Sequence, residues 1–352
     1  MATIIFDAER MKYPNTGLYY YCLLLGNELA KLDIKKRLGF YVPESSFDAF
    51  PKDVFKIKPQ TWHKLLMPRK ADFKVWHTTY QLSSYLPTNN KIDVVLTIHD
   101  LNFLKEGKSS VKEKKYLSQL QNNVDNASRI TTISHYVKKE IEEYCNLGGK
   151  TVEVIYNGSN FNTHSLSRSI KSRINSRPYL FTIGTIVGKK NFHVLPYLLI
   201  NNDLELLIAG ITQDVDYKNK IISIAEKCGV AERVKFLGAI TEEEKINYMT
   251  HCELFVFPSI AEGFGLPVVE AMALGKKTLL SSMTSLPEIG GELSYYFDNF
   301  EEEYLRDFGG NRLAGILSSD ALSADIIKWS EQFCWEKAAQ SYWEVYNTLL
   351  NA

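Results

Sequence analysis

The sequence FVFPSIAEGFGLPVVEAMALG, from Phe255 to Gly275, indicates the fold of the chain most clearly. It opens in the apolar run Leu254 to Phe257, whose aromatic and β-branched residues are typical of a buried strand. Gly263 and Gly265 follow, and glycine lets the backbone come close to a ligand or take a positive φ. A helix is then predicted from Pro267 to Leu274, because proline fits a first helical turn and a glycine follows the last residue. The N–H groups at its start predict a site for an anion, most naturally a phosphate.

Two carboxylates, Glu262 and Glu270, flank this turn with seven residues between them. Eight positions along one helix would separate them by about 12 Å, and an intervening turn leaves the distance open. A carboxylate pair for glycoside hydrolysis lies about 5 to 10 Å apart, so that role is not favoured. We expect each to accept from a different part of one ligand, Glu270 from ribose hydroxyls and Glu262 from a sugar hydroxyl. The alternative is a helix-capping Glu beside a solvated Glu.

The form EGFGLPVVEAMALG resembles the E-x7-E signature of the retaining family 4 glycosyltransferases. The resemblance is strongest from Tyr179 to Phe297 and weaker before Asn157, where TTISHYVKKEI and VIYNGS are similar to family segments. It implies the GT-B fold, in which two Rossmann-like, doubly wound parallel sheets face each other across a cleft. It also implies a donor site formed by Gly263, Phe264, Gly265, Leu266 and Glu270, with Glu262 in a catalytic role.

A second glycine-containing turn, GTIVGKKNF, follows the predicted strand Tyr179 to Ile183. It places Lys189 and Lys190 at a strand-to-helix turn, where two ammonium groups can clamp a diphosphate. The resembled family often has Arg-Lys-Asn here, whereas this chain has Lys-Lys-Asn. Because lysine lacks the bidentate fork of arginine, the resemblance carries the catalytic phosphate role to Lys190 more firmly than the donor-binding role to Lys189. A solvated lysine pair is the alternative.

Three residues near the predicted strand ends of the first half are candidates for the acceptor side. The buried strand Val94 to Ile98 delivers His99 and Asp100 to its carboxyl end, where ligands bind in doubly wound sheets. His99 there can donate to a sugar or phosphate oxygen, and we assign it a catalytic role. Gly17 lies in the loop after the first predicted strand, Thr3 to Phe6, and in the resembled family this loop borders the acceptor. A satisfied core histidine and an ordinary strand-to-helix turn are the alternatives.

Composition excludes several classes of protein. The 352 residues carry 41 basic and 41 acidic side chains, and this zero net charge argues against a nucleic-acid binder. The five cysteines are far apart and without CxxC spacing, which argues against a disulfide framework or a zinc site and fits a reducing cytosol. No run of eighteen apolar residues and no signal-peptide pattern occurs, so we expect a cytoplasmic protein.

A basic and aromatic stretch lies between residues 52 and 74. It has seven basic side chains against two acidic ones, interleaved with Phe55, Trp62 and Leu65 to Met67. This composition suits an anionic membrane surface, where each basic side chain contributes about 1 kcal/mol. The stretch therefore predicts peripheral contact with the inner face of the cytoplasmic membrane. A solvated basic face over a core helix is the alternative.

Strands alternate with helices twice along the chain, which predicts two α/β domains. We place an N-terminal, acceptor-side domain at residues 1–160 and a C-terminal, nucleotide-sugar-binding domain at 178–335. The Ser-, Arg- and Asn-rich segment 161–177 is interpreted as a linker. The end of the chain, 336–352, has aromatic residues at helical spacing, which predicts a helix packed back on the N-terminal domain.

The resemblance implies transfer of a hexose from a nucleotide diphosphate sugar to an acceptor hydroxyl of a carbohydrate or lipid-linked saccharide, with retention and without a metal or other cofactor. GDP-mannose is preferred over UDP-glucose, since the Lys-Lys-Asn form is nearest to mannosyltransferase-like members, and bacterial surface polysaccharide or lipopolysaccharide is the expected product. The DxD at Asp214 and Asp216 is interpreted as a solvated helix cap rather than a metal site. A Rossmann oxidoreductase lacks support because no G-x-G-x-x-G follows the first strand. A non-catalytic nucleotide-sugar-binding protein of the same fold remains the alternative.

Overall fold

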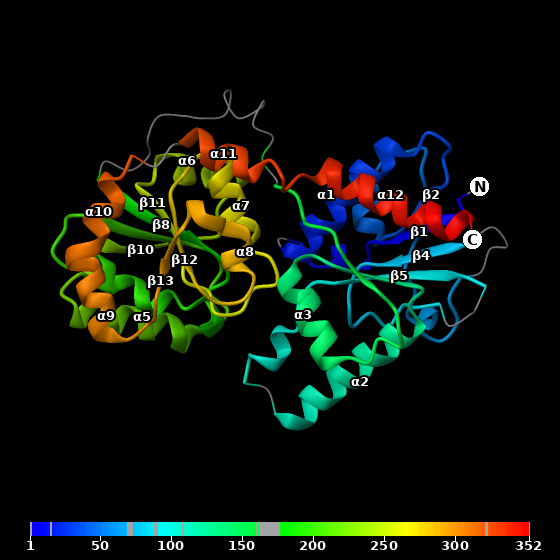
Figure 1. Cartoon of the computed structure of the whole chain (residues 1–352), viewed down its shortest axis with the longest axis horizontal. Helices are drawn as coiled ribbons and strands as arrows, with labels where there is room; N and C mark the ends of the chain where they lie inside the picture. Colours follow the sequence, from blue (N-terminus) through cyan, green and yellow to red (C-terminus); the bar gives the residue numbers. More distant parts are fainter. Residues whose placement is uncertain are drawn as a thin grey trace. The chain divides into compact units, whose positions relative to one another are not determined.

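The computed structural model describes residues 2–14, 16–68, 73–87, 91–107, 109–159, 161, 177–320 and 323–351. The chain divides into two compact units, one of Met1–Gly158 with Phe333–Ala352 and one of Ser159–Gln332 (Figure 1). These limits differ by two or three residues from the domain ends at 160 and 335 expected from the sequence. Residues 162–176 of the predicted linker lie outside the described residues.

The first unit is built on a parallel sheet whose strands lie in the order β3-β2-β1-β4-β5-β6-β7. Their bounds are β3 Phe55–Ile57, β2 Leu38–Tyr41, β1 Ile4–Asp7, β4 Val75–Thr78, β5 Asp93–Ile98, β6 Arg129–Thr132 and β7 Val152–Val154. β1 pairs with β2 on one side and β4 on the other, with Ile4 opposite Leu38 and Val75. The direction of winding therefore reverses between β1 and β4, the point at which doubly wound sheets bind ligands.

Four longer helices lie in the part of this unit that the structure describes: α1 Gly17–Leu32, α2 Ser110–Asn126, α3 His135–Tyr144 and α12 Trp335–Asn351. α12 lies beside α1, and Figure 1 shows these first and last helices of the chain next to each other. The aromatic residues of α12 predicted from helical spacing are buried, including Tyr342 and Tyr346. The C-terminal helix is therefore part of the first unit.

A buried polar network joins α12 to the first sheet. The Nδ1 atom of His77 lies 2.6 Å from the Tyr346 hydroxyl, and its Nε2 atom lies 2.7 Å from the Thr97 hydroxyl. The Tyr342 hydroxyl lies 2.9 Å from both Thr97 Oγ1 and the Tyr21 hydroxyl. Burial lowers the pKa of His77 to about 3, so its ring is neutral in this network at pH 7.

The second unit has a parallel sheet in the order β10-β9-β8-β11-β12-β13. The bounds are β10 Val234–Gly238, β9 Glu205–Ala209, β8 Tyr179–Ile183, β11 Leu254–Phe257, β12 Thr278–Ser281 and β13 Tyr295–Phe297. β8 pairs with β9 on one side and β11 on the other. Winding reverses between β8 and β11, the strands that precede the two glycine turns singled out in the sequence.

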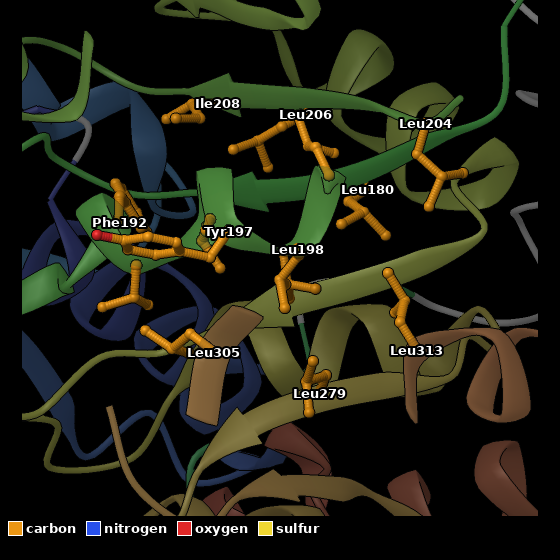
Figure 2. Packing of buried hydrophobic residues seen from close by; sticks show 14 of the residues in the cluster. Leu180, Phe192, Tyr197, Leu198, Leu204, Leu206, Ile208, Leu279, Leu305 and Leu313 are labelled. Atoms are coloured by element: carbon orange, nitrogen blue, oxygen red, sulfur yellow. The ribbon is translucent and has the colours of Figure 1, made fainter. Parts of the chain in front are cut away.

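Within its described residues, the second unit has the helices α5 Val215–Lys227, α6 Glu242–His251, α7 Leu266–Ala273, α8 Leu286–Gly290, α9 Glu302–Asp307, α10 Leu313–Ser318 and α11 Ser323–Ser330. One face of the sheet is covered by an apolar core in which Leu180, Leu206 and Leu279 contribute from the strands (Figure 2). Asp214 caps α5 by accepting from the Tyr217 N–H at 2.9 Å, which confirms the helix-cap interpretation of the DxD. Across the described residues, no helix is long and apolar enough to cross a membrane.

Candidate functional site

The switch point of the second sheet brings together two turns that lie about 70 residues apart in the sequence. The Gly188–Lys190 turn follows β8, and the loop to Gly265 follows β11. Two hydrogen bonds tie them, because the Lys189 carbonyl accepts from the Ile260 N–H at 2.9 Å and from the Ser259 hydroxyl at 3.1 Å. Lys189 therefore has a backbone role in building this edge, in addition to the donor-binding role predicted for its side chain.

Lys190 and Glu262 meet at this edge. The Lys190 ammonium lies 2.5 Å from Glu262 Oε1, and each side chain is 14% exposed. The ammonium also lies 5.0 Å from the centre of the Phe257 ring at the end of β11. A Cβ on Gly184 would lie 3.2 Å from Lys190 Cε, so the glycine gives the lysine stem its room. A cation is thus held, mostly desolvated, where a diphosphate would lie in a doubly wound domain.

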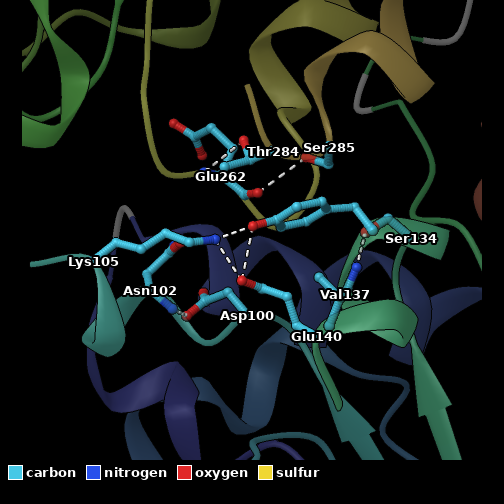
Figure 3. A network of polar contacts seen from close by, with 10 residues as sticks. Asp100, Asn102, Lys105, Ser134, Val137, Glu140, Glu262, Thr284 and Ser285 are labelled. Atoms are coloured by element: carbon cyan, nitrogen blue, oxygen red, sulfur yellow. Dashed lines mark hydrogen bonds and ion pairs between the residues drawn. The ribbon is translucent and has the colours of Figure 1, made fainter. Parts of the chain in front are cut away.

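The loop that carries Glu262 is held by two residues that the sequence analysis did not single out. The Glu262 N–H donates to Thr284 Oγ1 at 3.3 Å, and the Ser285 hydroxyl lies 3.1 Å from the carbonyls of both Glu262 and Phe264 (Figure 3). Thr284 takes a positive φ of 59°, which is uncommon for a β-branched residue. The run of polar residues directly after β12 could have indicated this role, because the carboxyl ends of parallel strands in one sheet lie at the same edge.

Helix α7 begins at Leu266, one residue before the predicted Pro267. Gly265 precedes it with a φ of 102°, and a Cβ there would lie 2.8 Å from Leu286 Cδ2. The positive φ and the lack of room for a Cβ both require glycine at this position. Gly263 is buried and Leu266 half-buried, while the Phe264 side chain is only 3% exposed. The predicted donor contacts of Gly263, Phe264, Gly265 and Leu266 would therefore come chiefly from the backbone.

Glu270 lies in the second turn of α7 and is 2% exposed. Its Oε1 atom accepts from the ammonium of Lys245 on α6 at 2.9 Å, and Lys245 also lies 2.9 Å from Glu242. The helix-capping alternative for Glu270 is wrong, because this residue lies inside α7 and not at its N-cap. The structure instead gives the carboxylate a buried counter-charge that the sequence did not reveal.

His99 lies at the corresponding edge of the first sheet, directly after β5. Its Nε2 atom is 2.9 Å from the Thr79 carbonyl, which can only accept, so Nε2 carries the proton. Burial lowers the pKa of His99 to about 4, and the ring is neutral at pH 7. The neutral ring then has Nδ1 as an acceptor, and the catalytic role assigned to His99 stays a prediction. Tyr21 fixes the ring by packing edge-on at 4.5 Å between centroids.

The two other acceptor-side candidates, Asp100 and Gly17, lie in the same unit as His99. Asp100 orders the loop after β5, because its Oδ1 atom accepts from the Asn102 N–H at 3.0 Å. Further along this loop, Lys105 bonds Tyr136 and Glu140 and so ties the loop to α3 (Figure 3). Gly17 is exposed at the first position of α1, and a Cβ there would meet nothing within 4 Å. A residue with a side chain would therefore fit at this position.

Sequence reasoning missed an ionisable group, Asp7, at the switch point between β1 and β4. Asp7 ends β1, is 3% exposed and accepts from the Glu9 N–H at 2.9 Å. Burial raises the pKa of Asp7 to about 8, so this carboxyl is largely protonated at pH 7. The Arg10 guanidinium stacks 3.8 Å from the centre of the Tyr80 ring, just after β4. The sequence DAER, residues 7–10, could have indicated this group, because it places ionisable side chains at the end of a buried strand and directly after it.

Comparisons with known proteins agree with this architecture. The model for Glycosyltransferase Family 4 matches residues 30–162, and that for Glycosyl transferases group 1 matches 167–305. The serotype-specific mannosyltransferase WbdA of Escherichia coli is 27% identical over 296 residues, which are 80% of this chain and 35% of WbdA. The chain thus spans about a third of that relative.

The O-antigen chain mannosyltransferase B of Escherichia coli is 24% identical over 98% of this chain and 100% of its own length. Among solved structures, Anabaena HepE in complex with UDP and glucose has a TM-score of 0.72 at 17% identity, covering 99% of this chain and 100% of HepE. The chain therefore belongs to the family 4 glycosyltransferases and has their two-domain, Rossmann-like GT-B fold. Within this family it resembles the mannosyltransferases named above.

Proposed function

We propose that the protein transfers mannose from GDP-mannose to a hydroxyl of a saccharide acceptor, with retention at the anomeric carbon, in the synthesis of a bacterial surface polysaccharide. The observation that carries this proposal is the Lys190–Glu262 pair at the switch point between β8 and β11. A cation and a carboxylate at one strand edge suit a ligand that has a diphosphate and a sugar hydroxyl side by side. The names of the mannosyltransferase relatives support mannose as the sugar.

The departing diphosphate is stabilised by the chain itself in this proposal. Lys190 supplies a cation of low exposure, and the backbone N–H groups from Gly263 to Leu266 lie at the positive end of α7. Oriented donors in a water-poor site stabilise developing charge by several kcal/mol. Asp214 and Asp216 lie at the exposed start of α5, where Asp214 is a helix cap. The reaction then needs no metal, and Glu262 orients a sugar hydroxyl.

We expect the purified protein to release GDP from GDP-mannose when a saccharide acceptor is present and to keep this activity in EDTA. Release is measured with a coupled GDP assay across GDP-mannose and UDP-glucose, with and without chelator, and the product's anomeric configuration is read by NMR. Loss of activity in EDTA that returns with Mn²⁺ would contradict the metal-free mechanism. Binding of GDP-mannose without any acceptor-dependent release would favour the non-catalytic sugar-nucleotide binder.

A surface of the first unit, formed by Trp62, Lys64, Leu65 and Leu66, supports docking on an anionic membrane. The apolar members are unusually exposed, at 54% for Trp62, 94% for Leu65 and 53% for Leu66. The Thr61–Lys64 turn is anchored from beneath by buried His63, whose Nδ1 lies 3.0 Å from the Tyr41 hydroxyl. An anchored turn that presents a Trp and two Leu beside a lysine matches the membrane interface. Arg69 and Lys70 of the basic stretch lie outside the described residues.

We expect the protein to sediment with vesicles containing phosphatidylglycerol and to bind less as salt rises. Lys64→Ala should weaken binding about fivefold, since one surface lysine contributes about 1 kcal/mol. The double change Trp62→Ser with Leu65→Ser should weaken it further by removing the apolar contact. Val111→Ser, which alters another exposed apolar residue on α2, is the matched control. Equal binding to neutral and anionic vesicles would remove the electrostatic part of this proposal.

A further inference from the structure

The turn after β1 carries four ionisable side chains that the proposed mechanism does not use. Asp7 ends β1, and Glu9, Arg10 and Lys12 follow it in a 3-10 turn. Because β1 pairs with both β2 and β4, this turn starts at the carboxyl edge of the first sheet, at the point where the winding reverses. Doubly wound domains bind their ligands at such an edge.

The charges of this turn do not balance. Glu9, whose side chain is 7% exposed, forms an ion pair with Lys12. Asp7 accepts from the Glu9 N–H, and its carboxyl is largely protonated at pH 7 because burial raises its pKa to about 8. Within the described part of the chain, no carboxylate forms an ion pair with the half-buried Arg10. Two cations therefore face one carboxylate at pH 7, and Arg10 holds the unbalanced positive charge.

Aromatic rings hold the Arg10 side chain. Its guanidinium carbon lies 3.8 Å from the centre of the Tyr80 ring and 5.3 Å from the centre of the Tyr13 ring. Stacking uses the face of a guanidinium, whereas its five N–H donors lie in its plane and match the oxygens of a phosphate or carboxylate. The two tyrosines therefore orient the cation and leave it able to form charge-assisted hydrogen bonds.

Tyr13 also adds a surface for a sugar ring. The residue is 49% exposed, and its ring centre lies 5.0 Å from the Lys12 ammonium. An exposed aromatic ring beside polar groups suits a sugar, because a sugar has an apolar face as well as hydroxyls. The turn thus has a ring face and an unbalanced cation next to each other, which suits a saccharide that carries a negative charge.

We propose that Arg10 binds an anionic group of the acceptor saccharide, a phosphate or a carboxylate, while Tyr13 packs against a sugar ring. This inference rests on the proposed function, with the first unit on the acceptor side. It makes Arg10 a specificity-determining residue, because a neutral acceptor gains no ion pair from the guanidinium.

Asp7 gives the proposed site a dependence on pH. Its carboxyl is neutral at pH 7 and loses its proton as the pH rises through about 8. The carboxylate that forms attracts Arg10 and repels an anion, so affinity for an anionic acceptor should fall between pH 7 and pH 9. Asp7→Asn keeps the shape of the side chain and stays neutral, so this variant should bind an anionic saccharide equally well at both pH values.

Other titratable groups surround Asp7 and its turn. Burial raises the pKa values of the nearby hydroxyl and thiol groups, which are those of Tyr41, Tyr80, Tyr85 and, to about 12, Cys22. Burial lowers the pKa of His77 on β4 to about 3, whereas for Lys12 the hydrogen bond to Glu9 outweighs burial and the pKa is raised. These groups therefore keep their charge states between pH 7 and pH 9. The charged residues described on the other elements packed against this turn are exposed or paired, namely Glu44 and Asp48 on the turn Glu44–Ala49 and Glu28 with Lys31 on α1.

The test is an NMR titration of the full chain with glucose 1-phosphate, glucuronate, methyl glucoside and inorganic phosphate, at saturating GDP so that the nucleotide site is occupied. At pH 7, the two charged sugars should bind at least about tenfold more tightly than methyl glucoside, the size expected for one charge-assisted contact. Inorganic phosphate should bind more weakly than glucose 1-phosphate, because it has no ring for Tyr13. From pH 7 to pH 9, the affinity of wild type for glucuronate should fall at least about threefold, and that of Asp7→Asn should not.

Arg10→Gln should remove the preference for the charged sugars, and Arg10→Lys, which keeps the charge without the fork, should keep part of it. Arg37→Gln is the matched control and should change nothing. Arg37 is also half-buried and lies 5.1 Å from the centre of the Trp343 ring, but it precedes β2 at the opposite edge of the sheet. The pH comparison with Asp7→Asn is an independent readout should Arg10→Gln not fold.

Three results would contradict this inference: charged sugars that do not bind, equal binding of charged and neutral sugars, or a preference that survives in Arg10→Gln. GDP release from GDP-mannose, measured on the same proteins, separates it from the proposed function. A wild type that prefers charged sugars but releases no GDP with any acceptor would keep the anion site and lose the transferase. Acceptor-dependent release by a wild type that binds charged and neutral sugars equally would keep the transferase and lose the anion site.

Discussion

Lys190→Ala is expected to lower turnover by about 10² or more while GDP-mannose still binds. A hundredfold loss corresponds to about 2.7 kcal/mol of transition-state stabilisation. We assign a transition-state stabilisation of this size to Lys190 because its side chain is only 14% exposed. Its ammonium also lies at the sheet edge where the sugar–phosphate bond would break. An interaction that strengthens as the diphosphate gains charge lowers kcat more than it raises KM. Steady-state GDP release, with kcat and KM determined separately, measures the effect.

Two further variants distinguish a loss of catalysis in Lys190→Ala from a loss of structure. Lys227→Ala removes an exposed lysine of the same unit, at the end of α5, and should leave kcat unchanged. Glu262→Gln removes the partner of Lys190, so GDP should bind at least as tightly as to wild type while turnover falls. A Lys190→Ala protein that keeps wild-type kcat and melts at the wild-type temperature would exclude Lys190 from the reaction.

The two turns of the candidate donor site were predictable because each is bounded by residues with strong local preferences. β8 and β11 have the predicted bounds, and α7 begins one residue earlier than predicted. An apolar run followed by Gly and Pro leaves little choice of local structure. The adjacency of the two turns, set by the hydrogen bonds to the Lys189 carbonyl, depends on strand order and is not a local property.

Residues that act through distant partners were the ones that the sequence could not reveal. Lys245 lies in a helix of charged and polar residues, and nothing in its spacing shows that it faces Glu270 on another helix. The proton position on His99 likewise depends on the carbonyl of Thr79, twenty residues earlier. Asp7 lies one residue beyond the predicted first strand, and only the strand order shows that it lies at a switch point. Charge at a site is set by tertiary neighbours, whereas strands and turns are set largely by local sequence.

Deletion of α12, from Trp335 to the end of the chain, is expected to abolish cooperative unfolding of the first unit. The deleted helix contains Trp335, Tyr342, Trp343 and Tyr346, all at most 7% exposed. Burial of a large apolar side chain contributes about 1.5–3 kcal/mol, so four such residues together reach the 5–15 kcal/mol of a typical domain's stability. The deletion also takes the Tyr346 hydroxyl from His77 and the Tyr342 hydroxyl from Thr97. Each polar group left buried without a partner costs about 1–3 kcal/mol.

Calorimetric unfolding of the full and shortened chains tests this prediction, and a deletion of only the last two residues serves as the control. The second unit, which contains Lys190, Glu262 and Glu270, keeps its own core and should still bind GDP after the deletion. Tyr342→Phe tests the contribution of the buried hydrogen bonds alone, because it removes the hydroxyl that Thr97 and Tyr21 share and keeps the ring. It should lower the free energy of unfolding by about 1–3 kcal/mol. Tyr144→Phe, at a site that is 47% exposed, should change it by less than about 0.5 kcal/mol. A shortened chain that retained the full-length transitions would show that α1 and the first sheet form a stable core without the last helix.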